Sequence, residues 1–116
     1  MSVKLITKPN EKIDIAEYHT IKDGLGRLLP SEPVYKQSNC SPPGGIGIFD
    51  DSATFEDLAT YAIDGLQIIV KETTVTDFDK PNDYRLEIII HPNVESARSF
   101  ARRVLDLSDK FEEVEL

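Results

Sequence analysis

Residues 66–76, which read LQIIVKETTVT, and residues 84–90, which read YRLEIII, are the two stretches that decide the fold. Both are rich in β-branched residues, which fit the pleated and half-buried surface of a sheet. We predict that they are two long strands, paired antiparallel through a turn-rich connector at 77–83. Ile89 falls on the polar side of the second strand, which indicates a central strand partly covered on both faces.

Three further segments have apolar residues at helical spacing, and we predict helices over 15–29, 55–63 and 94–108. Asp14 can cap the first helix, although the start of that segment also reads as a strand continuing through Ile15. The last helix has the most coherent apolar stripe of the three. Its first turn carries a glutamate, which suits the helix dipole.

The helix predicted at 55–63 depends on local signals at both ends. Thr54 is followed three residues later by Asp57, which resembles a capping box. Gly65 stands where a helix would end in a left-handed conformation. These two signals frame a short helix directly before the strand at 66–76.

The remaining segments complete the predicted order. We expect an edge strand at 3–7, a long loop at 30–45 that is rich in proline and glycine, and short strands at 46–49 and 113–116. The predicted fold class is α+β, with a small mixed or antiparallel sheet and about three helices packed on one face, in the order β-α-β-α-β-β-α, to which the segment 113–116 would add a last short strand. At 116 residues, we expect a single domain over 1–116.

Charge is the clearest global signal. Residues 1–46 hold six Lys/Arg and five Asp/Glu, whereas residues 47–116 hold seven Lys/Arg and sixteen Asp/Glu, for a formal net charge of −8. Such a field repels phosphate backbones and anionic lipids and attracts basic protein surfaces. We therefore expect neither direct nucleic-acid binding nor membrane binding. The same composition also serves to keep a protein soluble.

The cysteine content and the amino end indicate a cytoplasmic protein. Cys40 is the only cysteine, so no intramolecular disulfide can form, which fits a reducing compartment. The first eight residues have too short an apolar stretch for a signal peptide, and no run approaches the length that crosses a bilayer.

Candidate catalytic and metal-binding residues lack a recognisable pattern. Cys40 is followed by prolines that oppose a helix start, and only His19 and His91 could act as its base. These three residues also lack the paired spacing of a zinc site. The segment 77–83 starts like a calcium loop but lacks the glycine and the final glutamate of an EF-hand.

Two other segments have ordinary structural explanations. Asp50 and Asp51 could hold magnesium or act as acid and base, but they also suit a turn before an element. The glycine-rich stretch 42–47 matches neither a dinucleotide fingerprint nor a P-loop. We predict no cofactor and no metal, and we favour a binding protein over an enzyme without excluding catalysis.

The first hypothesis is an acidic protein-binding module that inhibits a basic partner such as a toxin or nuclease. Small acidic α+β proteins without catalytic motifs are typical of bacterial immunity proteins, and composition alone carries that analogy. Carboxylates would speed encounter with the partner while aromatic residues anchor the contact. The predicted contact residues are Asp50, Asp51, Asp57, Tyr61, Asp77, Phe78, Asp79, Asp83 and Tyr84.

The second hypothesis is a small enzyme or ligand-binding domain. The loop at 30–45 would cover a pocket that holds Tyr35, Cys40 and His91. Its basis is the length of that loop and its proline- and glycine-rich ends. The sequence names neither the partner nor the ligand.

Overall fold

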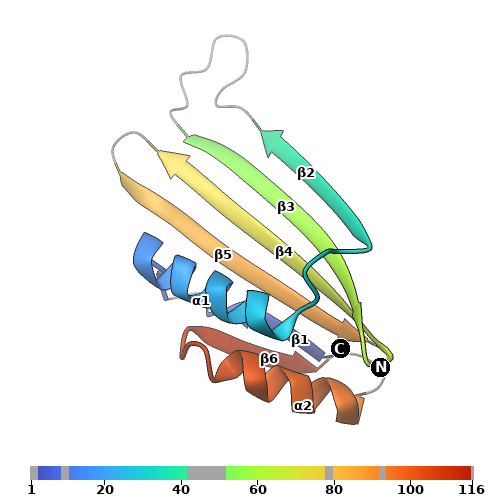
Figure 1. Ribbon diagram of the computed structural model, residues 1–116. Helices are drawn as coiled ribbons and strands as arrows, with labels where there is room; N and C mark the ends of the chain where they lie inside the picture. Colours follow the sequence, from blue (N-terminus) through green and yellow to red (C-terminus); the bar gives the residue numbers. More distant parts are fainter. Residues whose placement is uncertain (1–2, 9–10, 42–51, 78–79, 92–93, 116) are drawn as a thin grey trace.

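The structure of the protein is a computed structural model that describes residues 3–8, 11–41, 52–77, 80–91 and 94–115 (Figure 1). The described residues form one six-stranded sheet, with two helices against one of its faces. All of its strand pairs are antiparallel, in the order β2-β3-β4-β5-β1-β6. In chain order the elements are β1 Val3–Thr7, α1 Ile15–Leu28, β2 Tyr35–Ser41, β3 Ser52–Ile63, β4 Leu66–Asp77, β5 Lys80–His91, α2 Val94–Leu105 and β6 Phe111–Glu115.

The predicted α+β class and the placement of helices on one face are confirmed, whereas the number and order of elements differ. The described part of the chain has two helices instead of about three. Its order is β-α-β-β-β-β-α-β, because the predicted middle helix and the predicted long loop are both replaced by strands.

β3 and β4 form a long hairpin where we predicted a helix over 55–63. Twelve residue pairs join the two strands without interruption, and both Thr54 and Asp57 of the supposed capping box lie inside β3. The turn is Asp64–Gly65, whose φ angles of 51° and 79° are those that a type I′ hairpin turn requires. The helix prediction was wrong because pairing with a strong neighbouring strand outweighs a weak local helix preference.

β2 occupies the middle of the segment 30–45 that we predicted as a loop. All seven of its residues pair with β3, from Tyr35 opposite Thr60 to Ser41 opposite Thr54. The first five residues of β2 are exposed to solvent. A strand with water on both faces has no hydrophobic alternation, so the pattern that identifies half-buried strands is missing here.

β4 and β5 confirm the two predicted long strands and extend beyond them. β4 reaches Asp77 and β5 begins at Lys80, so most of the predicted connector 77–83 belongs to strands. β5 lies between β4 and β1, which confirms the central position that Ile89 indicated. A register shift between Val75 and Asp77 accompanies the end of this pairing.

The strands at the two ends of the chain lie side by side in the sheet. β1 confirms the strand predicted at 3–7, but it is not an edge, because it pairs with β5 on one side and β6 on the other. β6 confirms the strand predicted at 113–116, begins at Phe111 and forms this edge of the sheet. The strand predicted at 46–49 lies outside the described residues.

Both helices occur where the sequence predicts them. α1 matches the predicted 15–29 within one residue, and the Asp14 side chain accepts a hydrogen bond of 2.8 Å from the Glu17 backbone N–H. The alternative strand reaches no further than Ile13, which makes one isolated bridge to Tyr84. α2 ends at Leu105, three residues before the predicted end.

The core lies between the two helices and the side of the sheet that we call the helix face; we call the other side the open face. Alternate residues of the central strands point toward the helices, and the apolar stripes of α1 and α2 meet them. Burial of these side chains is the main source of stability. The core residues of the sheet and helices include Val3, Leu5, Ile21, Leu25, Ile68, Val70, Leu86, Ile88, Ile90, Ala97, Phe100, Ala101 and Val104.

Candidate interaction surface

Negative charge gathers at the end of the sheet that lies away from the β3–β4 turn. We define the acidic arm as Ser52–Asp57 of β3, Glu72–Asp77 of β4 and Lys80–Arg85 of β5, three segments that pair side by side. Figure 1 shows these strands running past the helices. The arm carries five carboxylates, Glu56, Asp57, Glu72, Asp77 and Asp83, against two cations, Lys80 and Arg85.

The structure describes five of the nine predicted contact residues. Asp57, Asp77, Asp83 and Tyr84 lie in the acidic arm, and Tyr61 lies further along β3. Asp50, Asp51, Phe78 and Asp79 lie outside the described residues. Strand register therefore brings together residues that are far apart in the sequence, which no local pattern could show.

The two tyrosines predicted as anchors have different surroundings. Tyr84 is only 8% exposed, and its ring stacks on that of Tyr18 with 4.5 Å between the centroids. Because this ring is part of the core, we do not include it in the contact surface. Tyr61 is half-buried and lines a groove of about 200 Å³ between α1 and the sheet, together with Leu25, Leu29, Ala59 and Val70.

Phe55 is an exposed aromatic residue of the arm that sequence reasoning did not select. It is 43% exposed on the helix face of β3, and Asp57 is exposed two residues further along the same face. The helix predicted over 55–63 counts Phe55 among its apolar residues, and the apolar side of such a helix would be buried. The Asp64–Gly65 hairpin signal could have corrected this, because it predicts a strand before the turn.

Two carboxylates face each other across the helix face of the arm. Asp57 is directly opposite Glu72 in the β3–β4 register, and like charges in that position repel. Glu72 accepts a 2.6 Å hydrogen bond from the Tyr18 hydroxyl and pairs with the Lys22 ammonium, both from α1. Among the described residues, Asp57 has no such cation, so its charge remains available to a partner.

The contact between α1 and Glu72 affects the protonation of Tyr18. Burial of the Tyr18 ring, the hydrogen bond to Glu72 and the nearby negative charge together raise the pKa of the Tyr18 hydroxyl. The tyrosine therefore stays neutral and continues to donate its proton well above neutral pH. This arrangement ties the first turns of α1 to the acidic arm.

The open face is nearly balanced in charge. Its ion pairs join Lys4 to Glu87, Lys71 Nζ to Glu56 Oε1 at 3.9 Å, and Arg85 Nε to Asp83 Oδ2 at 3.4 Å. These pairs are solvent-accessible and each contributes little to stability. They neutralise Glu56 and Asp83 locally, so among the arm carboxylates whose side chains the structure describes, the one without a cation is Asp57, on the helix face.

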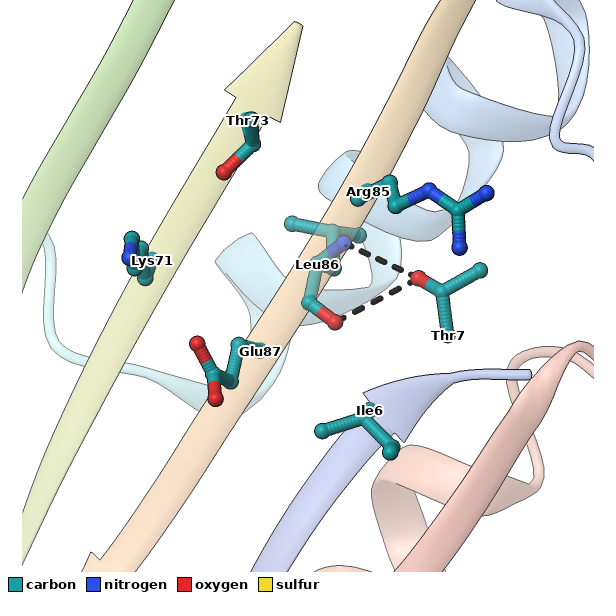
Figure 2. A pocket seen from close by; sticks show the side chains of 7 residues that line it. All are labelled: Ile6, Thr7, Lys71, Thr73, Arg85, Leu86 and Glu87. Atoms are coloured by element: carbon teal, nitrogen blue, oxygen red, sulfur yellow. Dashed lines mark hydrogen bonds between the residues drawn. The ribbon is translucent and has the colours of Figure 1, made fainter. Parts of the chain in front are cut away.

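A shallow hollow of about 220 Å³ lies on the open face where β1 ends beside β5 (Figure 2). Its lining combines the side chains of Lys71, Arg85 and Glu87 with Ile6 and Thr73. This volume, like that of the groove beside α1, is below the range of typical drug-sized ligand pockets. Neither hollow has the enclosed shape expected of a small-molecule site.

Thr7 lines this hollow and forms hydrogen bonds with the backbone of Leu86. Its hydroxyl accepts a 2.9 Å hydrogen bond from the Leu86 N–H and donates a 3.3 Å hydrogen bond to the Leu86 carbonyl, as Figure 2 shows. The side chain thereby satisfies β5 backbone groups at the point where β1 leaves the sheet. We assign it a structural role.

The strand register separates the two residues around which the second hypothesis places its pocket. Cys40 is opposite Phe55, which is opposite Thr74, whereas His91 is opposite Gln67 at the other end of β4. At the rise of a strand, positions 67 and 74 are roughly 23 Å apart. The structure thus separates Cys40 from His91, and the supposed lid at 30–45 contains β2.

Within the described ranges, no three His, Cys, Asp or Glu side chains form a group that could hold a metal ion. No described helix is long and apolar enough to cross a membrane. A scan against models of protein families found no match, and a search of curated proteins found none either.

Proposed function

We propose that the protein is a protein-binding module that engages a basic partner through the acidic arm, in the manner of inhibitors such as immunity proteins. The strand register supports this proposal, because it brings Asp57, Asp77 and Asp83 to one end of the sheet. Three further aspartates, at positions 50, 51 and 79, are adjacent in sequence to the ends of the strands that form the arm.

The arm offers both negative charge and an exposed aromatic side chain for contact with another protein. A local excess of carboxylates steers a cationic protein to this end and disfavours acidic competitors. Phe55, exposed beside Asp57, offers an aromatic side chain of the kind that anchors interfaces. We expect the partner to contact these two residues on the helix face and, around the end of the sheet, Asp83 on the open face.

Asp57 is the residue from which we expect the largest single contribution. Glu72, Glu56 and Asp83 each have a cation within the described structure, whereas Asp57 lies between Glu72 of β4 and Ser38 of β2, neither of which is a cation. A guanidinium or ammonium group of the partner would relieve the repulsion between Asp57 and Glu72. This relief favours the complex over the free protein.

The test compares two double variants that lose the same charge. Asp57→Asn with Asp83→Asn removes two carboxylates from the arm, and Asp64→Asn with Asp106→Asn removes two exposed carboxylates elsewhere. Each protein is immobilised and exposed to an extract of the native host in about 50 mM salt, where screening is weak. The retained protein is then identified, purified and titrated against all three baits.

We expect a basic protein that binds the wild type and the control equally and the arm variant about tenfold more weakly, with a smaller difference near 500 mM salt. Phe55→Ala should weaken the same complex without changing its salt dependence. Retention of no basic protein, or equal binding by both double variants, would contradict the proposal.

A further inference from the structure

The outer edge of β2 is a weakly protected strand edge. Within the part of the chain that the structure describes, β2 pairs with β3 on one side only, and alternate residues on its other side present N–H and C=O groups without a strand partner. Its sequence, YKQSNCS, contains one charge and no proline, and its seven pairs with β3 show no bulge. Of the devices by which proteins usually block edge pairing, β2 has a single lysine, Lys36, and lacks both proline and a bulge.

Exposed apolar side chains gather at the same edge. The large hydrophobic residues that are exposed among the described residues are Ile15, Val34, Tyr35 and Phe55. Val34 directly precedes β2, Tyr35 is its first residue, and Phe55 of β3 lies opposite Cys40 near its end. An edge that combines open backbone groups with exposed apolar side chains is suited to adding another strand.

We propose that β2 pairs antiparallel with β2 of a second copy of the chain. The register that overlaps all seven residues is centred on Ser38, which then lies opposite Ser38 of the second copy. A twofold axis perpendicular to the sheet relates the copies, so the two helix faces are continuous and the sheets merge into one. This inference goes beyond the proposed function and depends on different residues.

Charge in this register favours self-pairing. Lys36 is the only charged residue of β2, and it lies opposite position 40 of the second copy, so the two lysines do not face each other. On the next strand of the second copy, Phe55 continues the same row and Asp57 lies on the same face. A lysine side chain is attracted both to an aromatic face and to a carboxylate.

The dependence on salt separates this proposal from the proposed function. Each copy has a formal charge of −8, so two copies repel at long range and screening favours their association. Binding of a basic partner instead weakens as salt rises. Self-association that strengthens between about 50 and 500 mM salt is therefore distinct from the binding of a basic partner, and the variants below test whether it uses β2.

The first experiment is sedimentation of the full chain over roughly 5 to 500 μM, because a small strand-mediated interface is weak. Ser38→Lys places two ammonium groups opposite each other only in the dimer, and Ser38 is exposed, so the monomer tolerates the change. The control is Gln67→Lys, at an exposed position of β4. We expect Ser38→Lys to raise the dimer dissociation constant at least about tenfold and Gln67→Lys to leave it within about twofold.

A cross-linking experiment tests the register itself. In a Cys40→Ser background, Ser38→Cys should form a disulfide-linked dimer under mild oxidation, because directly opposite Cα atoms in an antiparallel pair are about 4.5–5.5 Å apart. Asn39→Cys should not, since its counterpart lies roughly 8 Å away in this register. Equal cross-linking at both positions would exclude the register.

Two results would overturn the proposal as a whole. One is a wild-type chain that stays monomeric at both salt concentrations up to roughly 500 μM. The other is a dimer that Ser38→Lys and Gln67→Lys affect equally. If β2 amide protons gain protection from hydrogen exchange only when a basic partner is added to a monomeric chain, the occupant of this edge is that partner and not a second copy.

Discussion

The two edge strands of the sheet, β2 and β6, differ in charge and in how far their side chains are buried. β6 carries three glutamates among its five residues, at positions 112, 113 and 115, whereas β2 carries one charge among seven. β6 follows α2 directly in the chain and sends Phe111 into the core, while the first five residues of β2 are exposed. Arg98 of α2 lies 3.8 Å from Glu113 across this edge.

This difference shows that the two halves of the sheet have different roles. The half with β1, β5 and β6 is covered by helices and closed by like charges that repel an added strand. The half with β2 and the acidic arm lacks helix cover over much of its length and keeps its backbone and side chains available. Stability is therefore concentrated in one half and surface for partners in the other.

Truncation of the buried aromatic at the β6 edge should produce the largest effect. Phe111 is 4% exposed, so Phe111→Ala removes buried surface and leaves a cavity, and we expect a loss of about 3–5 kcal/mol in the free energy of unfolding. Tyr35→Ala at the β2 edge should change it by only about 0.5 kcal/mol. Urea denaturation measures both, and equal losses would show that the two edges are supported alike.

Removal of the Thr7 hydroxyl tests how β1 is held against β5 within the helix-covered half. Thr7→Val keeps the side-chain shape but leaves the buried Leu86 N–H and C=O without their partner, so we expect a loss of about 1–3 kcal/mol. Thr73→Val in the same hollow should stay within about 0.5 kcal/mol, because no hydrogen bond of its hydroxyl occurs among the described residues. If Thr7→Val left the free energy of unfolding unchanged, the hydrogen bonds at the end of β1 would not be needed for the stability of the core.

Loss of the Tyr18 hydroxyl should have the smallest effect, and that effect should depend on pH. Tyr18→Phe removes the hydrogen bond to the partly exposed Glu72, for an expected loss of about 1 kcal/mol at neutral pH. The raised pKa means that the native protein holds this proton more tightly than the unfolded chain does. This contribution is complete below the usual tyrosine pKa of about 10 and is lost as pH rises toward the folded-state pKa.

The control for this prediction is the comparison of wild type and Tyr18→Phe at a series of pH values. The difference in urea midpoint between the wild type and Tyr18→Phe should be constant from pH 6 to about 9 and should shrink above about 10. A difference that grows above pH 10 would show that the sign of the Tyr18 pKa shift is wrong. Other lysines and tyrosines titrate in both proteins and cancel in the comparison.

Elements with a strong periodic pattern were predictable, and the others were not. β4, β5, α1 and α2 were predicted within a few residues, because each buries a distinct face and its sequence shows the corresponding period. β2 has no buried face and therefore no period. β3 has apolar residues at positions that fit a helix, and only its twelve pairs with β4 decide in favour of a strand.

The candidate surface was predictable in its chemistry but not in its shape. The acidic surplus after residue 46 predicted a contact through carboxylates, and this remains a proposal. The sequence did not indicate that Tyr84 stacks in the core, that Phe55 is exposed, or that Asp57 faces Glu72. Each of these depends on which strand lies beside which.

The amino-acid sequence by itself determined the α+β class, the two long central strands, both helices and the overall acidity, because these follow from local periodicity, capping and composition. Only the tertiary structure decided the strand order, the edge position of β2 and the meeting of residues 52–57, 72–77 and 80–85 in one acidic arm. The physical reason is that strand pairing joins backbone groups over long sequence separations, and neither its partner nor its register is encoded in any single segment.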